Sequence, residues 1–194
     1  MKFKIFKFKK VKSTNDTAIG LIKNNKKYIG CVYADMQTKG KGARGKKWIS
    51  RKGNLFSTLF FPMKGNYPPF NEFSLINPII ISNVIKIYCT KGNITFKFPN
   101  DIYVNDKKIC GILQEVINFK KKKFLIIGIG LNIISNPSLK KNYQATNIYL
   151  ESKNEPQIKE IIGSIISAYE SFFINLSSYN YVRIKKKIKS MTLN

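Results

Sequence analysis

The chain has 194 residues, of which 35 are Lys or Arg, 10 are Asp or Glu and none is His, so its formal net charge is +25. This length suits one domain, and 43% hydrophobic residues can build a core. The absence of His excludes a Ser-His-Asp or Cys-His relay, a His-ligated metal and imidazole acid–base chemistry. Any chemistry must rest on Lys, carboxylates, amides, backbone N–H groups or a bound cofactor.

The positive charge is carried almost entirely by lysine, because the only arginines are Arg44, Arg51 and Arg183. Surfaces that bind nucleic acid more often use Arg, whose planar guanidinium matches phosphates and guanine. Attraction to polyanions is expected at this charge. The accompanying bias towards Lys, Asn, Ile, Phe and Tyr is nevertheless typical of AT-rich codon usage, so we expect no specific nucleic-acid target.

Cysteine usage and hydropathy favour a cytoplasmic protein without a membrane partner. Cys31, Cys89 and Cys110 form no C-x-x-C pair, so we expect neither a zinc site nor disulfides but small core residues in a reducing compartment. Residues 1–10 alternate apolar residues with Lys and lack the apolar core of a signal peptide. The longest apolar stretch, 124–134, is far shorter than the roughly 20 residues of a membrane span.

The first half of the chain predicts alternating strands and helices. The expected elements are strands at 2–11, 30–35 and 55–61, helices at 13–27 and 73–88, and a polar, glycine-rich loop at 37–47. Ser13 is the expected N-cap of the first helix, and Asp16 stands at the capping-box position. Pro78 lies inside the second helix and predicts a kink or a late start.

The second half predicts a run of strands and then a long helix. The expected strands are 94–98, 102–104, 108–117 and 124–133, with a hairpin across Asn105-Asp106, an exposed turn at 120–123 and a loop at 135–147. The apolar face of a helix at 156–176 comprises Ile158, Ile161, Ile162, Ile165, Ile166, Tyr169, Phe172 and Phe173. A Lys-rich segment, 181–189, ends the chain. This order favours an α+β fold over a doubly wound α/β fold.

The first candidate site is the loop at 37–48, where three glycines alternate with cations. Its backbone N–H groups and lysines suit the binding of an anion. Residues 40–46 also satisfy the P-loop pattern G-x-x-x-x-G-K. Lys47 stands where that loop needs Ser or Thr, and a strand follows instead of a helix, so we reject that interpretation. The remaining alternative is a surface loop without function.

Two further candidates lie in strands. Lys108 stands early in an apolar strand, soon after the polar turn Asn100-Asp101 that follows Pro99. Residues 128–132 read G-x-G-x-N, and glycines in a strand often mark the close approach of a ligand. Taken alone, Lys108 fits an ordinary edge-strand lysine and the glycines fit a bulge. The order of the motifs is therefore more informative than any one of them.

Taken together, the motifs resemble the catalytic domain of biotin protein ligases, the biotin–[acetyl-CoA-carboxylase] ligases. The motifs that carry the resemblance are Ser13-Thr14-Asn15, Gln37, Gly40 to Trp48, Lys97-Phe98-Pro99-Asn100-Asp101, Lys108 with Gly111-Ile112-Leu113, and Gly128 to Asn132. The resemblance implies a mixed β-sheet with helices packed on it, related to class II aminoacyl-tRNA synthetases. It implies a catalytic domain at 1–178 followed by a Lys-rich segment at 179–194.

The resemblance also implies roles for individual residues. Implied biotin contacts are Ser13, Thr14, Asn15, Gln37, Gly40, Lys41, Gly42, Ala43, Lys108, Gly111 and Gly130. Implied ATP contacts are Arg44, Lys46, Trp48, Asn100, Asp101 and Asn132. Lys108 is the implied catalytic cation. No firm metal site is implied, although Mg²⁺ is expected with ATP, near Asp101.

The implied activity is ATP-dependent ligation of biotin to one Lys of a biotin carboxyl carrier protein through biotinyl-5′-AMP. The carrier would belong to acetyl-CoA carboxylase or a related biotin-dependent carboxylase, and the enzyme would be a monomer or a homodimer. Lys108 would neutralise the attacking carboxylate and the charge at phosphorus. Closure of the glycine-rich loop would shield the adenylate from water.

The chain departs from the family pattern at several points. Ala43 replaces an arginine of the loop, which predicts leakage of the adenylate, and Phe98 replaces a tryptophan. The family's small C-terminal β-barrel and the winged-helix segment of its repressors are expected to be absent. Three alternatives stay open. The first is a lipoate or octanoate ligase of the same fold, although the Arg-Arg-x-Ser-Gly-Gly-Gly loop of those enzymes is missing. The others are a degenerate homologue that binds biotin without transferring it and a basic nucleic-acid-binding module.

Overall fold

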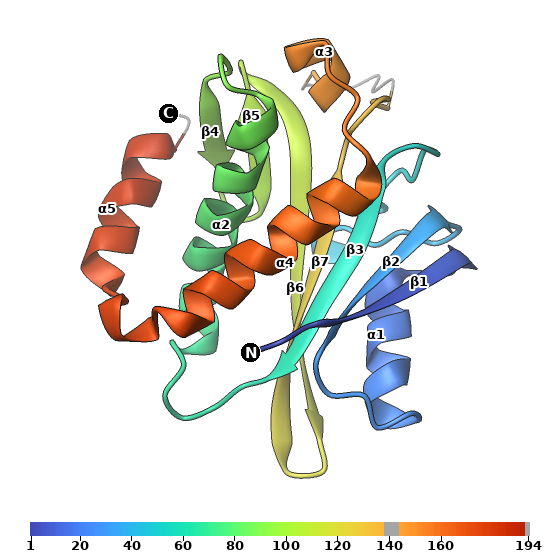
Figure 1. Cartoon of the computed structure of the whole chain (residues 1–194), viewed down its shortest axis with the longest axis vertical. Helices are drawn as coiled ribbons and strands as arrows, with labels where there is room; N and C mark the ends of the chain where they lie inside the picture. Colours follow the sequence, from blue (N-terminus) through green and yellow to red (C-terminus); the bar gives the residue numbers. More distant parts are fainter. Residues whose placement is uncertain (138–143, 193–194) are drawn as a thin grey trace.

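A computed structural model describes residues 1–137 and 144–192 (Figure 1). Its elements in chain order are β1 (Lys4–Val11), α1 (Thr14–Lys23), β2 (Gly30–Gln37), η1 (Ala43–Gly45), β3 (Leu55–Pro62), η2 (Phe70–Glu72), α2 (Phe73–Tyr88), β4 (Ile94–Lys97), β5 (Asp101–Val104), β6 (Lys107–Phe119), β7 (Lys122–Leu131), α3 (Ile148–Ser152), α4 (Ile158–Ile174), η3 (Leu176–Ser178) and α5 (Tyr181–Met191). The η elements are single turns of 3-10 helix.

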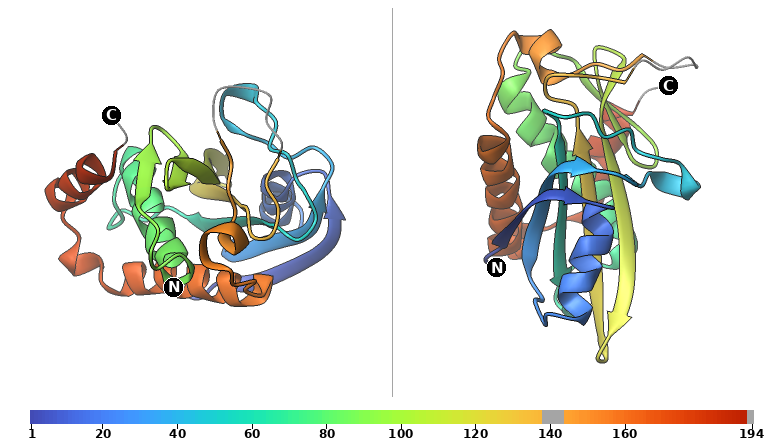
Figure 2. Two further views of the ribbon diagram at one scale, coloured as in Figure 1. Left: turned by 90° about the horizontal axis from the view of Figure 1, so that it is seen from above. Right: turned by 90° about the vertical axis from the view of Figure 1, so that its right-hand side faces the viewer.

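The seven strands named above form one mixed sheet in the order β1-β2-β3-β7-β6-β5-β4. β1 and β2 are parallel, whereas every other neighbouring pair is antiparallel. Helix α1 lies on one face of the sheet, and α2 and α4 lie on the other (Figures 1 and 2). The predicted α+β class with a mixed sheet is therefore confirmed.

Strand β3 is buried on both faces because helices cover both sides of the sheet. Leu59 and Phe61 belong to the larger core cluster, which also holds the buried side chains of α2 and α4. Phe60 points to the other face, where it joins Ala18 and Ile22 of α1 in a smaller cluster. The cleft described below lies on this second face, beyond the N-terminus of α1.

Of the two effects predicted for Pro78, a kink or a late start of the helix at 73–88, the late start is wrong. Helix α2 begins at Phe73 and continues through Pro78 to Tyr88. Pro78 lacks an N–H group, so the intrahelical bond that it loses is the one to the carbonyl of Ser74, in the first turn. The loss of one bond near the end of a helix leaves the remaining turns intact, and most of α2 is buried against the sheet.

The turn predicted at 120–123 is confirmed for its first two residues and wrong for the last two. Lys120 and Lys121 alone form the turn, with φ of 46° and 59°, while Lys122 already opens β7. Two residues with positive φ match the favoured two-residue hairpin turn. The hairpin at Asn105-Asp106 is confirmed, with φ of 49° and 61°.

Two helices at the C-terminal end were not predicted. Helix α3 is five residues long, and the Lys-rich segment forms α5, whose Ile184 and Ile188 pack into the larger core. Part of the predicted loop at 135–147 lies outside the described residues. None of the helices in the described ranges is long and apolar enough to cross a membrane.

Candidate active site

One cleft of about 350 Å³ is lined by nearly all of the residues that the sequence singled out. Those lining it are Ser13, Thr14, Asn15, Gln37, Lys41, Gly42, Ala43, Arg44, Lys46, Trp48, Asn100, Asp101, Lys108, Gly111, Gly130 and Asn132. Gly40 is the exception. It is buried inside the loop, where an added Cβ would lie 2.6 Å from the carbonyl oxygen of Trp48.

At one end of the cleft, buried polar side chains join the start of α1 to the end of β2. Ser13 is the predicted N-cap, and its Oγ accepts a hydrogen bond from the N–H of Asp16 at 3.4 Å. Oε1 of Gln37 accepts bonds from the N–H and the hydroxyl of Thr14, at 2.8 and 3.1 Å. Nε2 of Gln37 donates to Oγ of Ser50 at 3.1 Å, which ties this end to the loop.

At the other end, Lys108 meets Asp101. Nζ of Lys108 lies 2.7 Å from Oδ2 of Asp101, and the two side chains are 14% and 23% exposed. Nζ also lies 5.5 Å from the ring centroid of Trp48, within cation–π range. β6 is an internal strand between β5 and β7, so the alternative of an ordinary edge-strand lysine is wrong.

The floor between the two ends is formed by glycines under the indole of Trp48. Gly111 and Gly130 are paired across β6 and β7. An added Cβ would lie 2.7 Å from the indole at Gly111 and 2.4 Å from it at Gly130. β7 pairs in continuous register with both neighbours through this stretch, so the glycines mark a close approach and the bulge alternative is wrong.

The glycine-rich loop folds back on itself beside the cleft. Lys41 and Lys47 form an antiparallel bridge, and Arg44 and Gly45 turn the chain with φ of 54° and 73°. The ammonium of Lys41 pairs with the carboxylate of Asp16 on α1, and this hydrogen bond raises the pKa of Lys41. The loop is thus fastened to the start of α1, which does not fit an unattached surface loop.

Sequence reasoning missed residues that hold the cleft from behind. Oδ1 of Asn54 accepts a bond from the N–H of Ile133 at 2.9 Å, and the carbonyl of Thr146 accepts one at 3.0 Å from Nδ2 of Asn132, which the sequence did single out. Thr58 and Glu115 bond to Asn15. Their partners lie 43 and 100 residues away along the chain, so no local pattern reveals them.

A sequence model of the biotin/lipoate A/B protein ligase family matches residues 7–132. The chain belongs to this family. The match contains the Ser13-Thr14-Asn15 turn, the glycine-rich loop, Lys108 and Gly130, so the motifs that line the cleft lie inside the family region. Family membership by itself leaves open whether biotin or a lipoyl group is the substrate.

Among curated proteins, the chain is 30% identical over 151 residues to biotin–protein ligase 2 of Arabidopsis thaliana, covering 74% of this chain and 44% of that protein. It is 32% identical over 125 residues to a bifunctional ligase/repressor of Escherichia coli strain K12, covering 63% of this chain and 38% of that protein. The chain spans less than half the length of these relatives.

Solved structures of the family share the fold. The biotin protein ligase of Aquifex aeolicus in complex with biotin and ATP gives a TM-score of 0.79 at 28% identity, covering 97% of this chain and 78% of that one. The enzyme of Leishmania major in complex with biotin gives 0.79 at 25% identity, covering 98% and 81%. The ligase-like sheet and helices inferred from the motifs are confirmed.

Proposed function

We propose that the protein ligates biotin to one lysine of a biotin carboxyl carrier protein through biotinyl-5′-AMP, using ATP. The observation that carries this proposal is the cleft, which holds a polar end around Thr14 and Gln37 and a Lys108–Asp101 end, within a chain of the biotin/lipoate ligase family. The Aquifex aeolicus neighbour was solved with both biotin and ATP, which supports the same two ligands here.

The two ends of the cleft suit the two substrates. We assign biotin to the end formed by Ser13, Thr14, Asn15 and Gln37, whose amide and hydroxyl groups match a ureido ring. ATP is assigned to the end with the cations of the loop, Trp48 and the polar residues around Asp101. The other implied biotin and ATP contacts keep the roles that the sequence resemblance gives them. Gly40 is left out because it does not line the cleft.

In the first step, an oxygen of the biotin carboxylate attacks the α-phosphorus of ATP, and pyrophosphate leaves. Both partners are anions, so the transition state needs positive charge held in place. The ammonium of Lys108 supplies this charge, and its ion pair with Asp101 fixes its place in the cleft. Held there, the ammonium lies where it can contact both the biotin carboxylate and an α-phosphate oxygen. In the second step, the amine of the carrier lysine attacks the acyl carbon, AMP leaves, and the amine releases its proton.

Mg²⁺ fits the ATP end at Asp101. Oδ1 of Asp101 is buried and has no hydrogen-bond partner among the described residues, so it is free to face a cation. Mg²⁺ typically takes one or two carboxylates together with phosphate oxygens and water, and the described residues hold no cluster of three or more acidic or Cys ligands. Bound there, Mg²⁺ would neutralise charge on the phosphates of ATP.

The proposed partner is a biotin carboxyl carrier protein or domain, of acetyl-CoA carboxylase or a related carboxylase. We place the reaction in the cytoplasm, because the described cysteines Cys31, Cys89 and Cys110 are buried free thiols, as a reducing compartment allows. The proposed active form is a monomer or a homodimer.

Transfer to a purified carrier domain tests the proposal. Labelled biotin with ATP should label the domain, and replacing its acceptor lysine should abolish the label. Lipoate and octanoate, offered in place of biotin, should give no transfer. Transfer of lipoate or octanoate but not biotin would establish the alternative ligase, and biotin binding without transfer would establish the degenerate homologue.

A further inference from the structure

The side chain of Asn15 lies directly on the sheet. Asn15 is 3% exposed at the start of α1, and an added Cβ on Gly128 would lie 2.3 Å from its Oδ1. Gly128 belongs to β7, whose two neighbours are β3 and β6. The carboxamide therefore lies against the backbone of β7 at a position that carries no side chain.

Both ends of this carboxamide are bonded, one to each neighbouring strand. Oγ1 of Thr58 in β3 lies 2.6 Å from Oδ1 of Asn15, and Nδ2 of Asn15 donates to Oε2 of Glu115 in β6 at 2.6 Å. A flip of the amide would set its carbonyl oxygen against the carboxylate of Glu115, so Glu115 fixes the orientation. Within residues 1–137 and 144–192, one N–H and one oxygen lone pair of Asn15 have no further hydrogen-bond partner.

Glu115 does not line the cleft, whereas Asn15 does. Its negative charge also faces the ammonium of Lys41, whose pKa is raised chiefly by the hydrogen bond to Asp16 and further by the charge of Glu115. Glu115 thus lies behind both Asn15 and the anchored loop residue.

We propose that Glu115 is a positioning residue for biotin recognition, holding the Asn15 carboxamide so that its unused N–H and lone pair meet the ureido ring. This inference rests on the proposed function. The ureido ring carries both N–H and C=O groups, whereas the dithiolane of lipoate and the chain of octanoate carry neither. The Thr58–Asn15–Glu115 arrangement therefore favours biotin over the other substrates of this family's fold.

The test is steady-state biotin-dependent pyrophosphate exchange with Glu115→Ala. We expect the KM for biotin to rise about 10- to 100-fold, because a hydrogen bond to a charged group is lost. The KM for ATP and kcat at saturating biotin should stay within about twofold of wild type. Glu115→Gln should recover most of the affinity, because its amide oxygen still accepts from Asn15. Glu115→Met, which fills the space without an acceptor, replaces the alanine variant if the latter does not fold.

Gln114→Ala is the matched control. Gln114 is the preceding residue of β6, but it faces the helices, accepting from Nδ2 of Asn77 at 2.8 Å and donating to the carbonyl of Phe70 at 3.0 Å. Its loss should lower the melting temperature without raising the KM for biotin. A comparable rise in the two variants would mean that any damage to β6 weakens biotin binding, which would overturn the positioning role.

A double-mutant cycle shows whether Glu115 acts through Asn15. In an Asn15→Ala background, removal of Glu115 should change biotin affinity by less than about twofold, whereas fully additive effects would overturn the proposal. Calorimetric titration with biotin alone separates the two proposals. If wild type binds biotin and Glu115→Ala binds it equally well, only the role of Glu115 fails. If wild type neither binds biotin nor exchanges pyrophosphate, the proposed function fails and the inference with it.

Discussion

Individual residues shape the cleft partly by lacking side chains. Gly128 leaves the space that the Asn15 carboxamide occupies, and Gly111 and Gly130 leave the space under the indole of Trp48. Lys108 then lies over that indole and beside Asp101. The glycines were recognisable in the sequence as a sign of close approach, but the groups that approach them come from α1 and the loop, which only the fold brings there.

Gly130→Ala should displace Trp48. The added Cβ would lie 2.4 Å from the indole, which must move off the sheet. Trp48 is the only tryptophan of the chain, so its fluorescence emission should shift to the red. If Trp48 stacks on ATP, the KM for ATP should rise roughly three- to tenfold, since aromatic stacking is worth about 0.5–1.5 kcal/mol. Gly163→Ala in α4, where an added Cβ meets nothing within 4 Å, is the control and should leave the emission unchanged.

At the scale of elements, the strands were predictable and the C-terminal helices were not. The apolar runs and turn residues fixed most strands to within a few positions, because burial on both faces leaves a clear pattern. Helix α5 carries five cations, and its apolar residues are too few to stand out, although Asn180 caps its N-terminus by accepting from Arg183. Glu115 and Thr58 were missed because an ordinary polar residue in a strand gives no sign of a distant partner.

The glycine-rich loop yields a prediction about retention of the adenylate. Ala43 stands where the family resemblance implies a cation, so biotinyl-5′-AMP should escape and label bystander lysines when biotin and ATP are both present. Ala43→Arg should reduce this labelling while preserving transfer to the carrier domain. The measurement is the amount of labelled biotin that becomes attached to an unrelated lysine-rich protein when enzyme, biotin and ATP are mixed with it. Absence of bystander labelling at high enzyme concentration would contradict the prediction.

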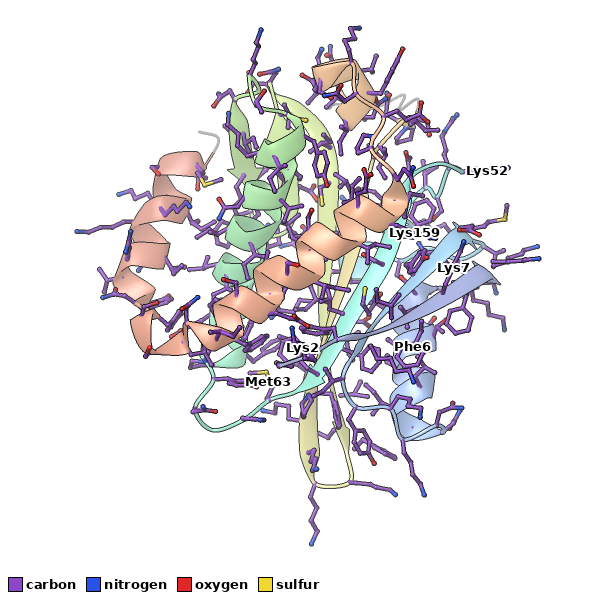
Figure 3. The ribbon with its side chains drawn as sticks, viewed as in Figure 1. Lys2, Phe6, Lys7, Lys52, Met63 and Lys159 are labelled. Carbon is purple, nitrogen blue, oxygen red and sulfur yellow. The ribbon has the colours of Figure 1, made fainter. Side chains whose placement is uncertain are left out.

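At the scale of the whole molecule, the net charge of +25 means that each acidic residue lies in a positive field and can pair with a lysine. Glu170 joins the N-terminal segment to α4, accepting from the ammonium of Lys2 at 2.9 Å and from the N–H of Phe3 at 3.0 Å. Figure 3 shows Lys2 beside α4. The bond from Lys2 is the largest cause of the lowered pKa of Glu170.

Glu170→Gln should destabilise the protein at neutral pH but not in acid. Because folding lowers the pKa of Glu170 below its ordinary 4.5, its contribution is complete above that value and is lost as the pH falls through the folded-state pKa. The effect at pH 7 should be at most about 1 kcal/mol, or roughly 2–4 °C in melting temperature, since the side chain of Lys2 is 89% exposed and water screens the pair. Melting curves at pH 7 and pH 3 measure it, and an equal difference at both would contradict the assignment.

The most direct test of the central claim is the exchange of labelled pyrophosphate into ATP, measured with wild type, Lys108→Ala and Lys107→Ala. Lys107 is the exposed neighbour of Lys108 and does not line the cleft. We predict exchange that requires biotin, that lipoate does not support, that falls about 10²- to 10³-fold in Lys108→Ala, and that persists in Lys107→Ala. Biotin-independent exchange, or full activity in folded Lys108→Ala, would contradict the account.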